Sequence, residues 1–200
     1  MEERRRLQKQ QLAQCERTRQ HVVRGDAMLG TVSPAEIDQM LATYRELGEA
    51  GVPEAWVGLT RYHLDPHGLH RSVGAAAECA CRAILGGSLD GARLLRQAMP
   101  ALSGDPRAQP PSAARARDAL TRMLSDDDTG LVHHVLGSMA FDGLGGPQDI
   151  PAFVAHHSIA ADRGLGLIHS RGRFVYVAVT WAAGACDGAS AGWLRLRAAS

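Results

Sequence analysis

Two pairs of adjacent histidines are the residues whose type and spacing suggest chemistry. His133-His134 and His156-His157 fall in two stretches with helical periodicity, separated by a glycine-rich loop. Imidazole nitrogens from two facing helices could bind zinc, as in a metal-dependent hydrolase. Phe153, His157 and Ala160 share one helix face, however, which indicates that His157 packs as a ring in the core. We therefore expect no metal at these histidines.

Other patterns with possible chemistry lack their usual context. Asp126, Asp127 and Asp128 offer carboxylates to a hard cation, but consecutive acidic residues at a helix start are typical of a cap. The stretch Gly143–Gly146 has no strand before it and no Lys-Ser/Thr pair after it, as a phosphate-binding loop requires. The sequence therefore predicts no enzymatic activity and no cofactor.

Composition and charge narrow the classes of partner. The chain has 200 residues, of which 45% are hydrophobic and 22% charged, and its formal net charge is +1. This balance gives no reason to expect a nucleic-acid or membrane partner. No apolar stretch is long enough to span a bilayer, and the polar segment from Met1 to Gln20 lacks the apolar run of a secretory signal. We expect a cytoplasmic protein whose cysteines are free thiols.

Helical segments alternate with short turns over most of the chain. Ser33-Pro34-Ala35-Glu36 has the residues of a capping box, and apolar residues follow it at spacings of three and four. The same reasoning predicts that Asp126–Thr129 caps a later helix and that Pro100 breaks an earlier one. The periodicity predicts helices over about 2–28, 34–47, 53–65, 73–85, 89–102, 113–124, 131–141 and 151–163.

One stretch has a specific internal pattern. Leu136-Gly137 is followed by Gly143-Leu144-Gly145, then Asp149, then Ala160-Ala161-Asp162-Arg163-Gly164. This order resembles the Sel1-like repeat, a relative of the tetratricopeptide repeat, although His156 and His157 stand where that family usually has aromatic residues. The resemblance implies an all-α fold, a short right-handed α/α solenoid of antiparallel helix pairs. Gly137 would allow a close helix approach, and Asp149 would cap the second helix.

The resemblance also divides the chain. Residues 1–33 form an N-terminal helix and turn, and residues 34–169 form the repeat array. Within the array, 130–164 is the best unit, 54–86 a weaker unit and 89–125 a degenerate one. Residues 170–200 form a C-terminal cap or irregular tail. The β-branched and aromatic run 174–181 favours a strand, but a buried capping helix remains open.

The function implied by such an array is to bind a protein or peptide partner on its concave face. His134, Ser138 and Phe141 share the face of their helix opposite its apolar stripe, and we predict them as the binding residues. For Phe141, contact with the next repeat is an alternative. The alternative functions are a metal-dependent hydrolase that uses the paired histidines and a degenerate repeat protein without independent activity. The partner, the pathway and the oligomeric state do not follow from the sequence.

Overall fold

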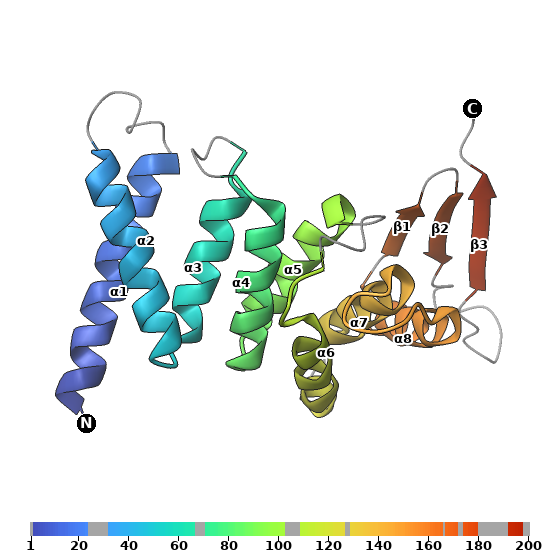
Figure 1. The fold of residues 1–200 in the computed structure, drawn as a ribbon. Coiled ribbons are helices and arrows are strands. Elements are labelled where there is room, and N and C mark those ends of the chain that lie inside the picture. Colours follow the sequence, from blue (N-terminus) through green and yellow to red (C-terminus); the bar gives the residue numbers. More distant parts are fainter. Residues whose placement is uncertain are drawn as a thin grey trace. The chain divides into compact units, whose positions relative to one another are not determined.

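In the described part of the chain, eight α-helices precede three β-strands (Figure 1). The structure, a computed structural model, describes residues 2–23, 32–66, 71–102, 109–126, 129–165, 167–171, 174–179 and 192–197. The helices are α1 (Glu2–Val23), α2 (Pro34–Glu49), α3 (Pro53–Leu64), α4 (Val73–Leu85), α5 (Leu89–Leu102), α6 (Ala113–Arg122), α7 (Leu131–Asp142) and α8 (Ile150–Asp162). A short 3-10 helix, Met123–Ser125, follows α6. The strands are β1 (Leu167–Arg171), β2 (Phe174–Val179) and β3 (Gly192–Arg197).

Two of the predicted helix starts are confirmed by their hydrogen bonds. The hydroxyl of Ser33 accepts from the backbone N–H of Glu36, and the Glu36 carboxylate accepts from the backbone N–H of Ser33, 2.7 Å away. At α8, the Asp149 carboxylate accepts from the backbone N–H of Ala152 at 2.9 Å. Both caps satisfy N–H groups that have no partner within the first helical turn.

One boundary prediction holds in part and another is wrong. The N-cap residue of α7 is Gly130, which has a φ of 76° and no side chain. The predicted run 126–129 contributes through Thr129, whose hydroxyl accepts from the backbone N–H of Leu131 at 3.3 Å. Asp127 and Asp128 themselves lie outside the described residues. Pro100 lies inside α5, which continues to Leu102, because a proline near the end of a helix removes only one backbone hydrogen bond.

The chain separates into two compact units, residues 1–116 and residues 117–200, whereas the sequence predicted one array over 34–169. In the first unit, α1 packs against α2, α2 against α3, α3 against α4 and α4 against α5, so consecutive helices lie side by side (Figure 1). Its core is built mainly from the buried faces of α1, α2 and α3, with residues from α4 and α5 joining it.

Helices in the first unit approach closely where a glycine faces an aromatic ring. A side chain built at Gly58 on α3 would place its Cβ 2.5 Å from the ring of Tyr44 on α2. A side chain at Gly48 on α2 would overlap with the indole of Trp56 on α3. Carbon atoms in contact lie about 3.5–4.0 Å apart, so only glycine fits at these two positions.

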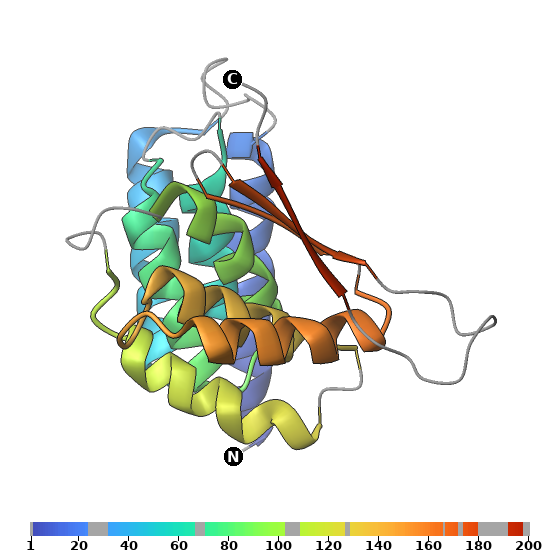
Figure 2. The same ribbon diagram turned by 90° about the vertical axis from the view of Figure 1, so that its right-hand side faces the viewer.

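The second unit combines a helix pair with a small sheet. Helices α7 and α8 pack together, and β2 contacts α8. The strands form an antiparallel sheet in the order β1-β2-β3 (Figure 2). In its register, Leu167 lies opposite Ala178 and Phe174 opposite Arg197. The strand preference of 174–181 is therefore borne out by β2 over 174–179, and residues 180 and 181 lie outside the described residues. The sequence did not predict β1 or β3, which pair with β2 along its two edges.

The helical class that the sequence predicts holds for every element described up to Asp162. In the part of the chain that the structure describes, no helix combines the length and the apolar character needed to cross a bilayer.

Candidate functional site

The three residues predicted to form a binding face are buried. His134, Ser138 and Phe141 have exposed fractions of 7%, 3% and 4%. The prediction assumed that α7 has one core face and one solvent face, but every residue from Leu131 to Phe141 is buried. A sequence signal for this was present, since 131–141 contains no charged residue, and a helix that is apolar on all sides is a buried helix. The placement of the binding face on these residues is therefore corrected.

Phe141 belongs to the core between α7 and α8. The centroid of its ring lies 4.8 Å from that of the Phe153 ring on α8, and Ala140 belongs to the same apolar cluster. The Gln148 side-chain amide donates to the Phe141 carbonyl at 2.8 Å, which ties the end of α7 to the following loop. Phe141 thus packs within its own helix pair.

His157 is a packed ring, as the sequence predicts. It is fully buried, and its Nδ1–H donates to the Phe153 carbonyl at 3.1 Å, which is the role left to a nitrogen facing a carbonyl oxygen. The centroid of its ring lies 4.9 Å from that of the His134 ring, and the two rings meet edge to face. A side chain built at Gly137 would overlap with Nδ1 of His157. The close helix approach expected at Gly137 is therefore confirmed.

The other two histidines share a hydrogen bond across the same helices. Nδ1 of His133 on α7 and Nδ1 of His156 on α8 are 3.0 Å apart. Such a contact requires a proton on one nitrogen and a lone pair on the other, so the pair holds one proton between the rings.

The surroundings of His156 favour its neutral form. Burial lowers its pKa below the ordinary value of 6.5, and the nearby His133 and Arg117 lower it further, while Asp149 opposes them. Protonation of both rings would place two positive charges in contact and leave no lone pair to accept the hydrogen bond between the two Nδ1 atoms. The arrangement can therefore respond to acid by weakening the contact between α7 and α8.

The histidines do not assemble into a recognisable metal centre. Catalytic zinc sites usually have three protein ligands, and the residues described in the structure contain no group of three or more His, Cys, Asp or Glu side chains suited to a metal ion. Ser138 Oγ lies 3.5 Å from Nε2 of His157, which is long for a hydrogen bond between a nucleophile and its base. Both side chains are enclosed, so a substrate has no access to them.

The sequence also contains the run Gly188-Ala-Ser190-Ala-Gly192, which has the Gly-x-Ser-x-Gly spacing of a nucleophile elbow. That elbow leads from a strand through the serine into a helix, whereas Gly192 here begins strand β3. Residues 188–191, which include this serine, lie outside the described residues.

Three cysteines are free and buried, as predicted. Burial raises the pKa of Cys79 to about 11 and that of Cys81 to about 12, so both thiols stay protonated near neutral pH. Cys15 is also buried, and burial raises its pKa. These cysteines have the character of core residues. Cys186 lies outside the described residues.

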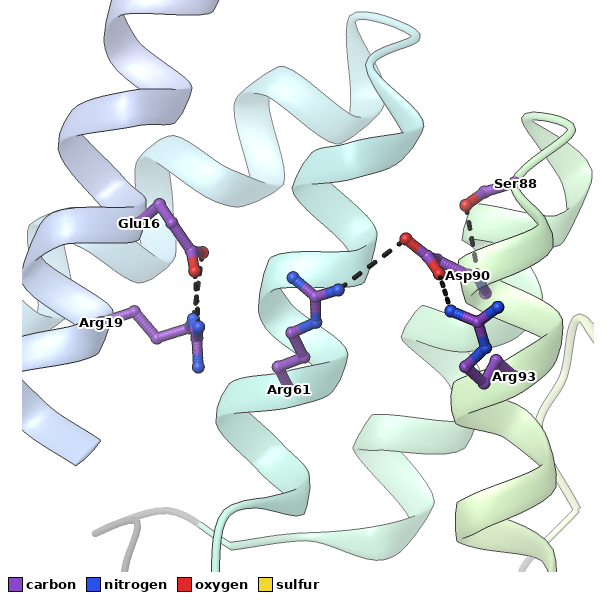
Figure 3. Close-up of polar contacts among 7 residues, drawn as sticks. Glu16, Arg19, Arg61, Ser88, Asp90 and Arg93 are labelled. Carbon is purple, nitrogen blue, oxygen red and sulfur yellow. Dashed lines mark hydrogen bonds and ion pairs between the residues drawn. The ribbon is translucent and has the colours of Figure 1, made fainter. Parts of the chain in front are cut away.

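In the first unit, charged side chains lie along α1, α3 and α5 (Figure 3). The Arg93 guanidinium is 2.9 Å from the Asp90 carboxylate on α5, and Arg61 on α3 reaches the same carboxylate at 3.8 Å. On α1, Glu16 and Arg19 form an ion pair. No sequence pattern singled these residues out, because the three helices are far apart along the chain.

The Glu16–Arg19 pair is tied to the core below it. The hydroxyl of Tyr44 on α2 donates to the Glu16 carboxylate at 3.1 Å. Burial alone would raise the pKa of Glu16, but the hydrogen bond and charge of Arg19, together with Tyr44, outweigh it and lower that pKa. Glu16 is therefore ionised at neutral pH and holds Arg19 in place.

A pocket of about 400 Å³ lies between the N-terminal half of α1 and the turn that leads into α3. Its lining includes Arg5, Lys9 and Leu12 from α1, and Val52, Pro53 and Glu54 from the other wall. The pocket therefore combines basic side chains with apolar ones. It could not be predicted from the sequence, because it requires the face of α1 and the α2–α3 turn to be brought together.

Comparison of the chain with protein-family models, with curated proteins and with solved structures finds no match.

We predict that Gly137→Leu destabilises the second unit by about 1–3 kcal/mol, because the new side chain must displace the His157 ring. Chemical denaturation followed by circular dichroism measures the change. Gly74→Leu is the matched control: Gly74 also lies in a helix, but a side chain built there has nothing within 4 Å. Equal stability of wild type and the Gly137 variant would mean that α7 and α8 do not approach closely here.

We predict that Phe141→Ala costs about 3–5 kcal/mol of stability, the range for removing a buried phenylalanine ring. Ile159→Ala on α8 is the control, since Ile159 is 39% exposed and should cost much less. Thermal unfolding of both variants measures the difference. A Phe141→Ala variant as stable as the Ile159→Ala variant would contradict the burial of Phe141 in the core.

We predict that the ring protons of His156 titrate below 6.5 in an NMR pH series. Because the unfolded state then binds the proton more tightly than the folded state, this group's contribution to stability is complete above pH about 6.5. It falls as the pH drops towards the folded pKa. His156→Gln should flatten this part of the stability curve. A His156 pKa at or above 6.5 would contradict the neutral, shared-proton pair.

Proposed function

We propose that this chain is a Sel1-like helical repeat protein whose first unit holds a partner protein on the face formed by α1, α3 and α5. The proposal includes the finer architecture, a short solenoid of antiparallel helix pairs. It also includes a cytoplasmic location, which the free thiols of the described cysteines favour.

The best repeat unit supports the resemblance through the roles of its residues. Gly143 and Gly145 have φ values of 68° and 73°, and Gly164 has a φ of 84°, so all three adopt the left-handed backbone that glycine tolerates best. Asp149 caps α8, and Gly137 lies against a ring on α8. The backbone of these glycines, the Asp149 cap and the close approach at Gly137 support the proposal.

The weaker unit supports it less closely. Gly58, the counterpart of Gly137, also packs against a ring, but that ring is Tyr44 on the preceding helix rather than a residue on the following one. Gly86 ends α4 with an ordinary negative φ, and the left-handed residue is Gly87. The two units therefore use glycine for close approach in different directions.

The contacts of the first unit support a curved array. Helix α1 contacts α3, and α3 contacts α5, in addition to the contacts between consecutive helices. Helices α2 and α4 have at most slight contact. In a stack of helix pairs, the layer whose helices lie closer together is the inner side of the curve. Solenoids use that side for binding, which favours the α1/α3/α5 face.

The observation that carries the proposal is the exposed charge on that face. The side chains of Arg61, Asp90 and Arg93 are 42%, 48% and 59% exposed, and Figure 3 shows them beside Glu16 and Arg19 across three helices. Ion pairs this exposed contribute little to stability, so they are free to exchange for contacts with a partner. Arginines that carry such exchangeable pairs are well suited to an interface.

A photo-crosslinking residue placed at Arg93 and, as control, at Arg45 on the exposed side of α2 tests the proposal in cells of the native host. We expect a discrete crosslinked protein from position 93, absent from position 45, and weakened when Arg61→Glu is added. The same protein captured equally from both positions would contradict the choice of face. No discrete product from either position would favour a degenerate repeat protein.

A further inference from the structure

We propose that the pocket between α1 and the α2–α3 turn binds an acidic protein segment in which an aliphatic side chain lies next to a carboxylate. The inference rests on the proposed function only in that a protein partner supplies this segment. It concerns a different surface from the row of charged side chains on α1, α3 and α5.

The pocket has the size and the walls of a side-chain binding site. Its volume of about 400 Å³ falls at the lower end of the range for ligand pockets. On α1, Arg5, Gln8, Lys9 and Leu12 follow the spacing that places residues on one helix face. The opposite wall is the short run Gly51–Glu54, which leads into α3.

The apolar part of the pocket is built on the core. Leu12 and Val52 are partly buried and pack against the core cluster of the first unit. Pro53 is supported from behind by the end of α4, since a Cβ built at Gly86 would lie 2.7 Å from the Cβ of Pro53. Gly51 has a φ of 89° and presents no side chain, which leaves that wall low. An aliphatic side chain would therefore enter a surface that needs no rearrangement, which favours binding.

The charged part of the pocket selects the occupant. Arg5 and Lys9 are exposed, and neither has an ion-pair partner in the described part of the chain. Two cations one helical turn apart suit a carboxylate. Glu54 on the other wall would repel a second carboxylate and can accept N–H groups from an extended backbone. A segment with one carboxylate next to one aliphatic side chain fits the two cations, Glu54 and the apolar part of the lining. A nucleic acid would be repelled by Glu54 and would leave the apolar part uncovered.

Selection from a phage-displayed library of random peptides against the purified full-length chain tests this inference. We expect the enriched peptides to contain Asp or Glu beside Leu, Ile or Val, and their affinity, measured by fluorescence anisotropy, to fall at higher salt. Arg5→Glu and Lys9→Glu should each weaken binding about tenfold or more. Arg4→Glu and Arg6→Glu change the same charge on the same helix turn but do not line the pocket, and should change it much less.

Four results would overturn the inference. The first is enrichment of basic or purely apolar peptides, and the second is no enrichment at all. The third is an equal loss of affinity in the Arg4 and Arg5 variants, which would reduce the effect to the general charge of α1. The fourth is a loss of affinity in the Arg61→Glu variant with no loss in the Arg5→Glu or Lys9→Glu variant, which would place the peptide on the α1/α3/α5 face. That result would leave the proposed function standing while removing the pocket. Circular dichroism of each variant shows that it is folded.

Discussion

Side-chain rings that pack directly against helix glycines set the separation of neighbouring helices in both units. Tyr44 lies against Gly58 in the first unit, and His157 lies against Gly137 in the second. Each ring is held by a polar contact as well, Tyr44 to the Glu16 carboxylate and His157 to the Phe153 carbonyl. Because protein interiors are close-packed, a methyl group added at either glycine has no space to occupy, and the helices would have to move apart.

The surfaces assigned to binding depend on the first of these contacts, the one between Tyr44 and Gly58. Tyr44 joins α2 to α3 through Gly58 and α2 to α1 through Glu16, so it sets where α1 lies. The position of α1 in turn determines both the pocket and the place of Arg19 beside α3. In the second unit, His157 packs against Gly137 on α7, and this brings Nδ1 of its neighbour His156 within 3.0 Å of Nδ1 of His133. The proton-sharing pair is thus a consequence of helix packing, and it needs no catalytic purpose.

Local signals in the sequence predicted most of the helices, because caps, glycines and apolar spacing act over a few residues. Ser33, Asp149 and Gly164 do what their types imply. Predictions failed where the answer depends on contacts distant in sequence. The placement of His134 and Ser138 on a solvent face failed for another reason. It relied on the apolar spacing along α7, although the absence of charged residues from 131–141 is typical of a helix buried on all sides. The pocket and the row of charged side chains join helices far apart in the chain, so no motif could show them. Strand β2 matched its propensity, but its pairing with β1 and β3 did not follow from it.

The most direct test of this account is a nuclear Overhauser measurement on the isotope-labelled chain. We expect cross-peaks from the Gly58 α-protons to the Tyr44 ring and from the Gly137 α-protons to the His157 ring, since each glycine lies in contact with its ring. These protons report the helix separation itself, independently of any partner. Absence of the Gly58–Tyr44 cross-peaks, with the Tyr44 ring showing the shifts of a solvent-exposed side chain, would contradict the packing on which both proposed binding surfaces depend. Absence of the Gly137–His157 cross-peaks would contradict the close approach of α7 and α8.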